Sequence, residues 1–501
     1  MKNDNTFVKA MLNDANRTYT ENGRRALKAA HTALLTLHGV GGALRSTDPI
    51  RVCRLYDAAC EESPLLATKE AFYIGDIRGG LGERKIRRIL LKHIANRHPE
   101  NLVDNIALLG EYGRFDDMYE LIGTKLESEM WSAMSAQFEQ DRKALAAGQP
   151  VSLLAKWIKT PDASSKATRK LGIMTAIKLG YSVYEFKRIL KSLRAHLKIV
   201  EAMMSANRWD EIDYSAVPSR ASMIYRNAFA RHDEERYGDF IQAALAGNAK
   251  INAATLYPYD IVEKSMRGED SDTLEALWRQ LPDYVGTGRN AVVMADVSGS
   301  MTWTSNRPLA TSIGLALYFA ERNTGAYRNV FMTFSTNPEI VSVHGVTLVD
   351  KLNYIRSADW GGSTNLEAAF RKILDIALEN GTSPEDMPES LIVISDMEID
   401  AADSSSWSFH DDMAALYKRH GYDLPKVVFW NVESRNDTFL ADGRRPGVFL
   451  ASGQSPVVFK SIFSGDLVTA EDLMLSILES ERYAAITVRD SYVPRPATRS
   501  A

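Results

Sequence analysis

Apolar residues recur at three- and four-residue steps through most of residues 1–285, a period that predicts helices rather than strands. One such run contains Ala26, Leu27, Ala30, Ala33, Leu34 and Leu37, and it predicts a helix that is ended by Gly39, Gly41 and Gly42. Further helices are expected at residues 49–61, 66–75, 83–97, 101–111, 115–147, 166–179, 182–205 and 220–246. Consecutive helices without strands predict an all-α array of stacked helical hairpins, comparable to HEAT repeats, although no strict internal repeat is visible.

The pattern changes after residue 286, where short apolar runs alternate with amphipathic segments. Residues 291–295 and 391–395 lack polar alternation, as expected for central parallel strands that are covered on both faces. Further strands are expected at 330–334, 427–431 and 457–459, an antiparallel edge strand at 339–344, and helices at 308–322, 349–355, 366–379, 408–420 and 470–482. This alternation predicts a doubly wound, mostly parallel α/β sheet with helices on both faces.

The change of pattern also predicts the domain organisation. At 501 residues the chain exceeds one ordinary domain. The polar, glycine-containing stretch 266–290, with a short helix expected at 272–284, separates the two patterns. We therefore expect a helical domain over 1–285, an α/β domain over 286–490 and a flexible tail over 491–501, which contains Pro494 and Pro496.

Composition argues against a membrane protein and favours the cytoplasm. The chain is 45% hydrophobic and 25% charged, contains no run of roughly 18 apolar residues, and begins without the apolar core of a secretion signal. Cys53 and Cys60 lie in a helical pattern, about 10 Å apart along the axis at roughly 1.5 Å per residue, which is beyond disulfide reach. We expect packed thiols in a cytoplasmic protein.

Charge is unevenly distributed along the chain. Residues 1–285 hold 41 Lys and Arg against 37 Asp and Glu, whereas residues 286–501 hold 19 against 27. Two basic clusters lie in the first part, at residues 78–97 and 151–200. Their candidate nucleic-acid contacts are Arg78, Arg84, Lys85, Arg87, Arg88, Lys156, Lys159, Lys166, Arg169 and Lys170. The alternative is an ordinary solvated helix surface, but two clusters set against an acidic second half favour an anionic partner.

The apolar run from Val292 to Ala295 leads directly into Asp296-Val297-Ser298-Gly299-Ser300. A buried strand ends there, and open α/β sheets place their ligands at the carboxyl ends of strands. Asp296 offers an anionic oxygen, and Ser298 and Ser300 offer neutral hydroxyls at alternate positions, a set of hard donors that suits Mg²⁺ or Mn²⁺. The alternative is that the serines cap the following helix and Asp296 is a turn residue.

Two later segments extend this motif. Trp360-Gly361-Gly362-Ser363-Thr364-Asn365 precedes a helix, and strand 391–395 runs into Asp396. In this order, Asp-x-Ser-x-Ser, the Gly-Gly-Ser-Thr loop and a strand ending in Ser-Asp resemble the metal-ion-dependent adhesion site of a von Willebrand factor type A domain. The resemblance implies that the ion is held, partly through water, by Asp296, Ser298, Ser300, Thr364 and Asp396, with Ser363 as a rival to Thr364. In that family the ion keeps one position open for a carboxylate from a protein partner.

The helical half carries a second resemblance. Its distinctive pieces are Arg78-Gly79-Gly80-Leu81-Gly82-Glu83-Arg84, residues 112–117, residues 153–157, and residues 218–221 running to 231–233. Over nearly the whole chain they resemble an uncharacterised family that pairs a helical array with a von Willebrand A domain and is related to the TROVE-domain, or Ro, RNA-binding proteins. The link to Ro proteins is architectural. It implies a ring of helices that binds small noncoding RNAs and the ends of misfolded RNA.

These observations predict a non-enzymatic RNA-binding protein that also binds a divalent metal ion. One alternative is a metal-dependent protein–protein adaptor with no RNA role, in which the basic clusters serve only solubility. Another is a phosphoryl-transfer enzyme with a two-metal cluster of Asp296, Asp396, Glu398 and Asp400. Against the enzyme, Ser298 stands where a haloacid-dehalogenase-type site has its second aspartate, and Glu398 and Asp400 are expected on a solvated loop.

Overall fold

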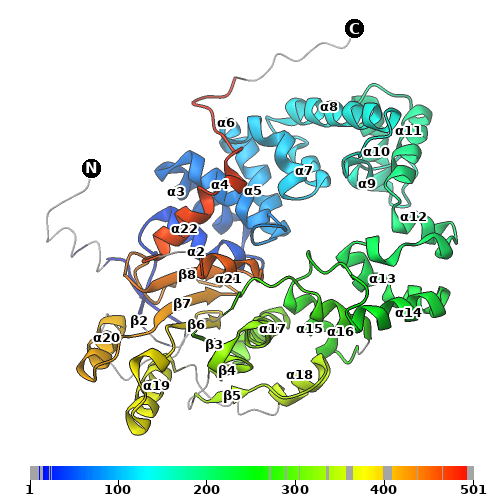
Figure 1. Cartoon of the computed structure of the whole chain (residues 1–501). Helices are drawn as coiled ribbons and strands as arrows, with labels where there is room; N and C mark the ends of the chain where they lie inside the picture. Colours follow the sequence, from blue (N-terminus) through cyan, green and yellow to red (C-terminus); the bar gives the residue numbers. More distant parts are fainter. Residues whose placement is uncertain are drawn as a thin grey trace. The chain divides into compact units, whose positions relative to one another are not determined.

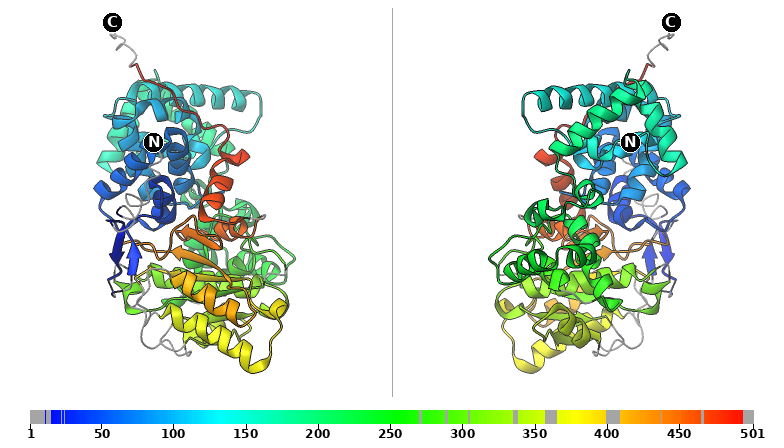
Figure 2. Two further views of the ribbon diagram at one scale, coloured as in Figure 1. Left: turned by 90° about the vertical axis from the view of Figure 1, so that its left-hand side faces the viewer. Right: turned by 90° about the vertical axis from the view of Figure 1, so that its right-hand side faces the viewer.

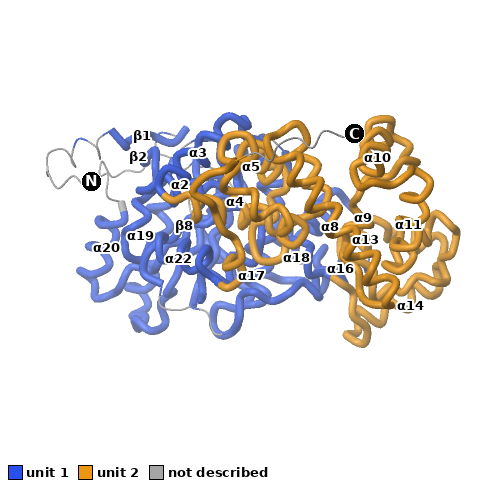
Figure 3. Tube along the Cα trace, turned by 90° about the horizontal axis from the view of Figure 1, so that it is seen from above, with its two compact units in different colours: residues 1–62, 253–480 blue, residues 63–252, 481–501 orange. Residues whose placement is uncertain are grey.

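The protein divides into two compact units, each built from two separate stretches of chain (Figure 3). The computed structural model describes residues 11, 15–21, 23, 25–269, 272–287, 290–303, 305–334, 338–356, 365–398, 409–436, 438–464 and 467–493. The sheet unit comprises residues 1–62 and 253–480, and the helical unit comprises residues 63–252 and 481–501. These units differ from the predicted division at residue 285, because α15 (Pro258–Met266) packs against α17 (Arg307–Arg322) within the sheet unit.

The sheet unit contains a six-stranded sheet in the order β5-β4-β3-β6-β7-β8 (Figure 1, Figure 2). The strands are β3 (Ala291–Ala295), β4 (Val330–Thr333), β5 (Ile340–Ser342), β6 (Ser390–Ser395), β7 (Lys426–Asn431) and β8 (Val448–Ser452). All neighbouring strands pair in parallel except β5, which is an antiparallel edge strand. Every residue of β3 and β8 is buried. The predicted mostly parallel sheet with its antiparallel edge is therefore confirmed.

Helices surround this sheet. They are α15, α16 (Asp272–Arg279), α17, α18 (Leu348–Arg356), α19 (Leu366–Asn380), α20 (Phe409–Arg419), α21 (Val457–Ile462) and α22 (Ala470–Leu478). Helix α17 packs on β3, β4 and β6, and α22 packs on β8. The predicted strand at 457–459 is wrong, since these residues begin α21 and the last strand is β8. A three-residue apolar run does not distinguish a strand from a buried helical turn.

Residues 15–62 contribute a second small sheet and two helices to the sheet unit: β1 (Arg17–Tyr19), β2 (Arg25–Leu27), α2 (Ala33–Val40) and α3 (Pro49–Glu62). The predicted helix starting at Ala26 is wrong at its beginning. Leu27 and Phe439 exchange backbone hydrogen bonds of 2.7 and 2.8 Å, so this stretch is extended. Helix α2 instead starts at Ala33, where the Glu62 carboxylate accepts the first two backbone N–H groups. Cys53 and Cys60 lie in α3 and are not joined by a disulfide, as expected; Cys60 is buried and Cys53 is half-buried.

The helical unit contains α4 (Pro64–Gly75), α5 (Arg84–Arg97), α6 (Pro99–Leu102), α7 (Leu109–Tyr112), α8 (Glu127–Ala146), α9 (Leu154–Trp157), α10 (Lys166–Lys178), α11 (Val183–His196), α12 (Val200–Ser205), α13 (Ser219–His232) and α14 (Glu234–Leu245). The predicted helix 115–147 is split into a 3₁₀ helix, Phe115–Leu121, and α8. Gly123, at φ +75°, lies in the break. Among the described residues, no helix combines the length and apolarity needed to cross a bilayer.

The chain returns to the helical unit after residue 480. The Arg482 guanidinium donates to the buried Asp76 carboxylate at 2.6 and 3.0 Å, and the Tyr483 hydroxyl donates to it at 3.1 Å. Within the predicted tail, the Tyr492 hydroxyl donates to the Lys125 carbonyl at 3.0 Å. The chain is therefore anchored as far as Tyr492, and residues 494–501 lie outside the described part.

Candidate metal centre and basic surfaces

Asp296 and Asp396 meet at one edge of the sheet. Strands β3 and β6 pair in parallel with Ala295 opposite Ile394, so the residues that follow them lie side by side at the carboxyl ends. The backbone N–H of Asp296 donates to the Ile394 carbonyl at 3.0 Å. Both aspartates are buried, with 0% and 2% of their surface exposed. The fold thus brings together two acids that are one hundred residues apart in sequence.

Hydroxyl groups converge on the Asp296 carboxylate. Its Oδ1 accepts the backbone N–H of Ser298 at 2.8 Å, and its Oδ2 accepts the Ser395 hydroxyl at 2.6 Å. The Ser298 and Ser300 hydroxyl oxygens lie 3.0 Å apart. The Ser298 side chain makes no capping hydrogen bond to the 3₁₀ helix Gly299–Thr302, so capping does not account for this serine.

The environment of the paired acids disfavours negative charge. Burial raises the pKa of Asp296 to about 6, and the negative charge of Asp396 adds to this, while hydrogen bonds from Ser395 and Ser298 act in the opposite direction. Two neighbouring carboxylates that are both buried need a positive charge beside them if both are to stay ionised. The site therefore has the electrostatic character of a cation site.

Arg435, which sequence reasoning missed, supplies one such charge. Its Nη2 lies 3.0 Å from Asp396 Oδ2 and donates to Glu21 Oε2 at 3.2 Å, while its Nη1 donates to the Ser300 carbonyl at 3.3 Å. The Arg435 side chain is only 15% exposed, and its guanidinium lies 4.9 Å from the centre of the Trp303 ring. Arg435 follows β7, the strand that pairs with β6, and no sequence motif marks it.

Glu398 is also part of this site. The expectation that it lies on a solvated loop is wrong, because it is 2% exposed. Its carboxylate accepts the backbone N–H of Glu21 at 2.6 Å and the side-chain amide of Asn436 at 3.2 Å. Burial raises the pKa of Glu398. Asp400, named with it in the enzyme alternative, lies outside the described residues.

The described donors fit a hard divalent cation. Two carboxylates and two serine hydroxyls converge, and Asp396 Oδ2 is buried without a well-directed hydrogen bond from any described group. The Arg435 guanidinium and a metal ion would compete for this oxygen. Thr364 and its rival Ser363 lie outside the described residues, so their part in the site stays a prediction.

The basic cluster at residues 78–97 is mostly engaged within the helical unit. Arg87 is 2% exposed and donates to the Leu109 carbonyl at 2.9 Å, which places it in the core. The side chains of Arg84 and Arg88 pair with buried aspartates, and the Arg78 guanidinium donates to the Glu111 carbonyl at 2.7 Å. Lys85 is exposed. Groups of the same unit thus hold Arg84, Arg87 and Arg88 in place.

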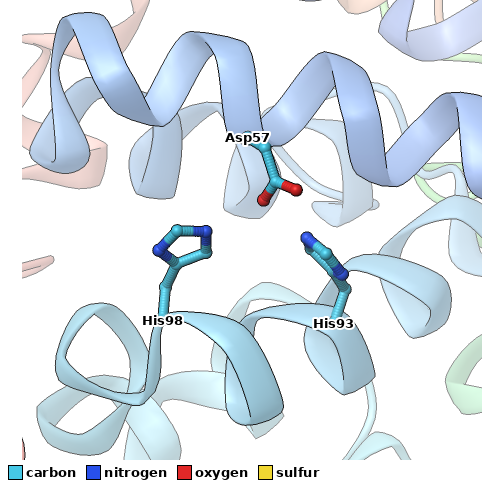
Figure 4. A group of neighbouring side chains, drawn as sticks. All are labelled: Asp57, His93 and His98. Carbon is cyan, nitrogen blue, oxygen red and sulfur yellow. The ribbon is translucent and has the colours of Figure 1, made fainter.

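Helix α5 also carries His93, and His98 follows its last residue, with the two imidazole rings 6.1 Å apart (Figure 4). An ideal helix would place residues five apart on different sides of its axis. The chain leaves the helix at His98, where φ is −132° and ψ is 54°, and this turn brings the rings together. Sequence reasoning did not single out this pair.

The second basic cluster differs from the first, because its cations are exposed on α10 and α11. Lys166, Lys170 and Lys191 are exposed and have no carboxylate partner among the described residues. Arg169 is exposed and donates to the carbonyls of Ala163 and Ser164. Earlier in the same cluster, Lys159 pairs with Asp116 at 3.3 Å, and the Lys156 Nζ lies 5.4 Å from the Trp157 ring centre. The α10–α11 hairpin is therefore the main free basic surface of this cluster.

Comparisons with known proteins give matches in both parts of the chain. Residues 290–491 match a family described as a domain of unknown function (DUF7788), and residues 154–285 match another, DUF2828. An uncharacterized protein, L728, of Acanthamoeba polyphaga mimivirus is 27% identical over 467 residues, covering 85% of this chain and 81% of that protein. The crystal structure of the Deinococcus radiodurans Ro (RSR) protein aligns at 15% identity with a TM-score of 0.35, covering 92% of this chain and 95% of that one.

Proposed function

We propose that this protein is a non-enzymatic RNA-binding protein whose α10–α11 hairpin contacts the phosphate backbone of structured noncoding or misfolded RNA. The observation that carries the proposal is a set of exposed lysines, Lys166, Lys170 and Lys191, that pair with no carboxylate in the part of the chain that the structure describes. From Lys166 to His196 the sequence holds eight Lys and Arg and a single acid, Glu185. Such a surface attracts a polyanion by releasing its counterions, so binding weakens as salt rises.

The apolar side chains of the same hairpin support a nucleic-acid ligand. Tyr184 is 75% exposed and Ile177 is 66% exposed. Lysines beside exposed aromatic and aliphatic groups can contact both the phosphates and the faces of unpaired bases. A surface that served solubility alone would have no need to expose these apolar groups among its lysines.

Reversing the charge of the free lysines tests this proposal. We expect the triple variant Lys166→Glu, Lys170→Glu and Lys191→Glu to bind a structured RNA at least about tenfold more weakly at low salt, with a smaller dependence of affinity on salt. Fluorescence anisotropy measures both. The control is the triple reversal of Lys250, Lys418 and Lys426, which are exposed, lie outside the hairpin and give the same change in net charge. Equal losses in the two variants would contradict the proposal.

The sheet unit favours a second function, metal-dependent binding of an acidic partner, as in the adhesion site of von Willebrand A domains. Its support is the buried carboxylate pair, Asp296 and Asp396, with the hydroxyls of Ser298 and Ser300 beside it. These residues, together with Thr364, would hold Mg²⁺ or Mn²⁺. The ion would supply a positive charge that can accept a carboxylate from a protein partner.

We expect Asp296→Ala to abolish Mg²⁺ binding without unfolding the helical unit, because it removes the most buried anionic donor of the site. Calorimetric titration measures the affinity, and circular dichroism checks the helix content. Asp423→Ala is the matched control, since Asp423 lies in the same unit and its side chain is 94% exposed. Full Mg²⁺ affinity in Asp296→Ala would show that the ion site has been assigned wrongly.

A further inference from the structure

Four cationic side chains of the helical unit converge on one buried carboxylate oxygen, Oδ2 of Asp116. Arg84 Nη2 and Arg114 Nη2 each lie 2.8 Å from it, and Arg88 Nη2 and Lys159 Nζ each lie 3.3 Å from it. Asp116 itself is 3% exposed. The cations come from α5, from the residue before the 3₁₀ helix Phe115–Leu121 and from the segment after α9, so the fold gathers them from three places.

Positive charge exceeds negative charge in this cluster. Besides Asp116, the only carboxylates paired with these cations in the described part of the chain are Asp117 and Glu120. The buried Arg87, 3.7 Å from Asp117, adds a fifth cation. Five cations against three carboxylates leave a surplus of two positive charges; the members are Arg84, Arg87, Arg88, Arg114, Lys159, Asp116, Asp117 and Glu120.

Hydrogen-bond donors are also in surplus. Arg84, Arg88 and Arg114 use their Nε and Nη2 atoms on the aspartates, and their Nη1 atoms donate to no acceptor among the described residues. The three side chains are 38%, 31% and 32% exposed, so these donors are open to solvent. Each Nη1 carries two N–H groups. A charged acceptor from outside can therefore bind without breaking the internal ion pairs.

The donors are held in place before any ligand arrives. The Arg114 guanidinium lies 3.5 Å from the centre of the Trp157 ring, and its backbone N–H donates to Asp117. Arg84 and Arg88 lie one turn apart on α5 and share both aspartates. Fixed guanidinium groups lose little conformational entropy on binding an anion.

We propose that the Asp116 cluster, with the eight members named above, is a binding site for a phosphate dianion, which it holds through Arg84, Arg88, Arg114 and Lys159. A surplus of two charges matches a phosphomonoester or inorganic phosphate, and guanidinium groups match the geometry of its oxygens. The site goes beyond the proposed RNA surface, since the α10–α11 cations are spread along a hairpin, whereas these cations surround one point. The phosphate can come from the end of an RNA chain or from a small phosphorylated molecule.

Inorganic phosphate is the direct probe. We expect isothermal titration of the wild-type protein to show saturable phosphate binding that sodium chloride at equal ionic strength does not reproduce. Lys159→Gln and Arg114→Gln should each weaken that binding at least about tenfold, because each removes a charge-assisted hydrogen bond. Lys92→Gln, an exposed lysine on the same helix as Arg84, is the control and should leave it unchanged.

Lys159→Gln keeps all the guanidinium groups around Asp116, so it is the variant expected to keep its fold. If a variant fails to fold, the titration of the wild-type protein tests the proposal by itself. The proposal is overturned if phosphate produces no more binding than sodium chloride does. Equal phosphate binding by Lys159→Gln, Arg114→Gln and wild type would also overturn it. The source of the phosphate group is then identified by comparing three affinities: those of oligoribonucleotides with a phosphorylated end, of oligoribonucleotides with a hydroxyl end, and of a small phosphomonoester. Tighter binding of phosphorylated ends assigns an RNA terminus, and equal binding of all oligonucleotides assigns a small molecule.

Discussion

At the scale of single residues, the candidate metal centre consists of two aspartates and an arginine that lie far apart in sequence. The two aspartates could be predicted, because each follows a buried apolar strand and parallel strands end at a common edge. Arg435 could not, since its loop has no motif and its contact with Asp396 exists only after β6 and β7 pair. The burial of Glu398 was missed for the same reason, because its partners Glu21 and Asn436 come from distant segments.

Arg435 supplies a positive charge beside the buried Asp396. We expect Arg435→Gln to lower the free energy of unfolding by roughly 3 kcal/mol in the presence of a chelator, because it leaves a buried charge unpaired. Mg²⁺ should restore more stability to this variant than to wild type, since the guanidinium no longer competes for Asp396. Urea unfolding with and without Mg²⁺ measures both effects. Arg419→Gln, at an exposed arginine of α20, is the control. Unchanged stability in the chelator would refute this role for Arg435.

At the scale of helices and strands, periodicity predicted the elements that have a clear apolar or amphipathic run in their own sequence. The strands β3, β4, β6 and β7 and the helices α17 and α19 appear within a residue or two of their expected bounds. The failures lie where distant contacts decide. Residues 25–27 are extended because Leu27 pairs with Phe439, and β8 was missed although it joins β7 along its whole length. Local apolar spacing contains no information about such partners.

The close approach of Gly42 to Gly453 is one such distant contact. A Cβ atom at Gly42 would lie 2.6 Å from the Cα of Gly453, so backbone would have to move. We expect Gly42→Ala to destabilise the protein by roughly 2 kcal/mol, as overpacking does. Gly238→Ala is the control, because a Cβ there meets no atom within 4 Å and alanine favours helix α14. Thermal unfolding measures the melting temperatures of Gly42→Ala and Gly238→Ala. A melting temperature for Gly42→Ala equal to that of Gly238→Ala would disprove this packing argument.

At the scale of the whole molecule, the sequence indicated two kinds of structure but not which stretches build each unit. The composition changes near residues 266–290, whereas the sheet unit begins again at Ala253 and also takes in the first 62 residues. A linear reading cannot detect that α15 packs on α17 or that residues 481–493 return to the helical unit. The net charges of residues 1–285 and 286–501 favour the first part as the place for an anionic partner, and this stays a prediction; the proposed α10–α11 surface lies in that part.

RNA binding by the α10–α11 hairpin is the proposed function of this protein. The most direct test is ultraviolet crosslinking in the cells that naturally make the protein, followed by mass spectrometry of the peptides that carry a nucleotide and sequencing of the RNA. We predict crosslinks within residues 166–196, with Tyr184 among the modified residues, and a discrete set of structured RNAs that is lost in the triple charge reversal but kept in Asp296→Ala. No recovered RNA, or crosslinks confined to the sheet unit, would contradict the account.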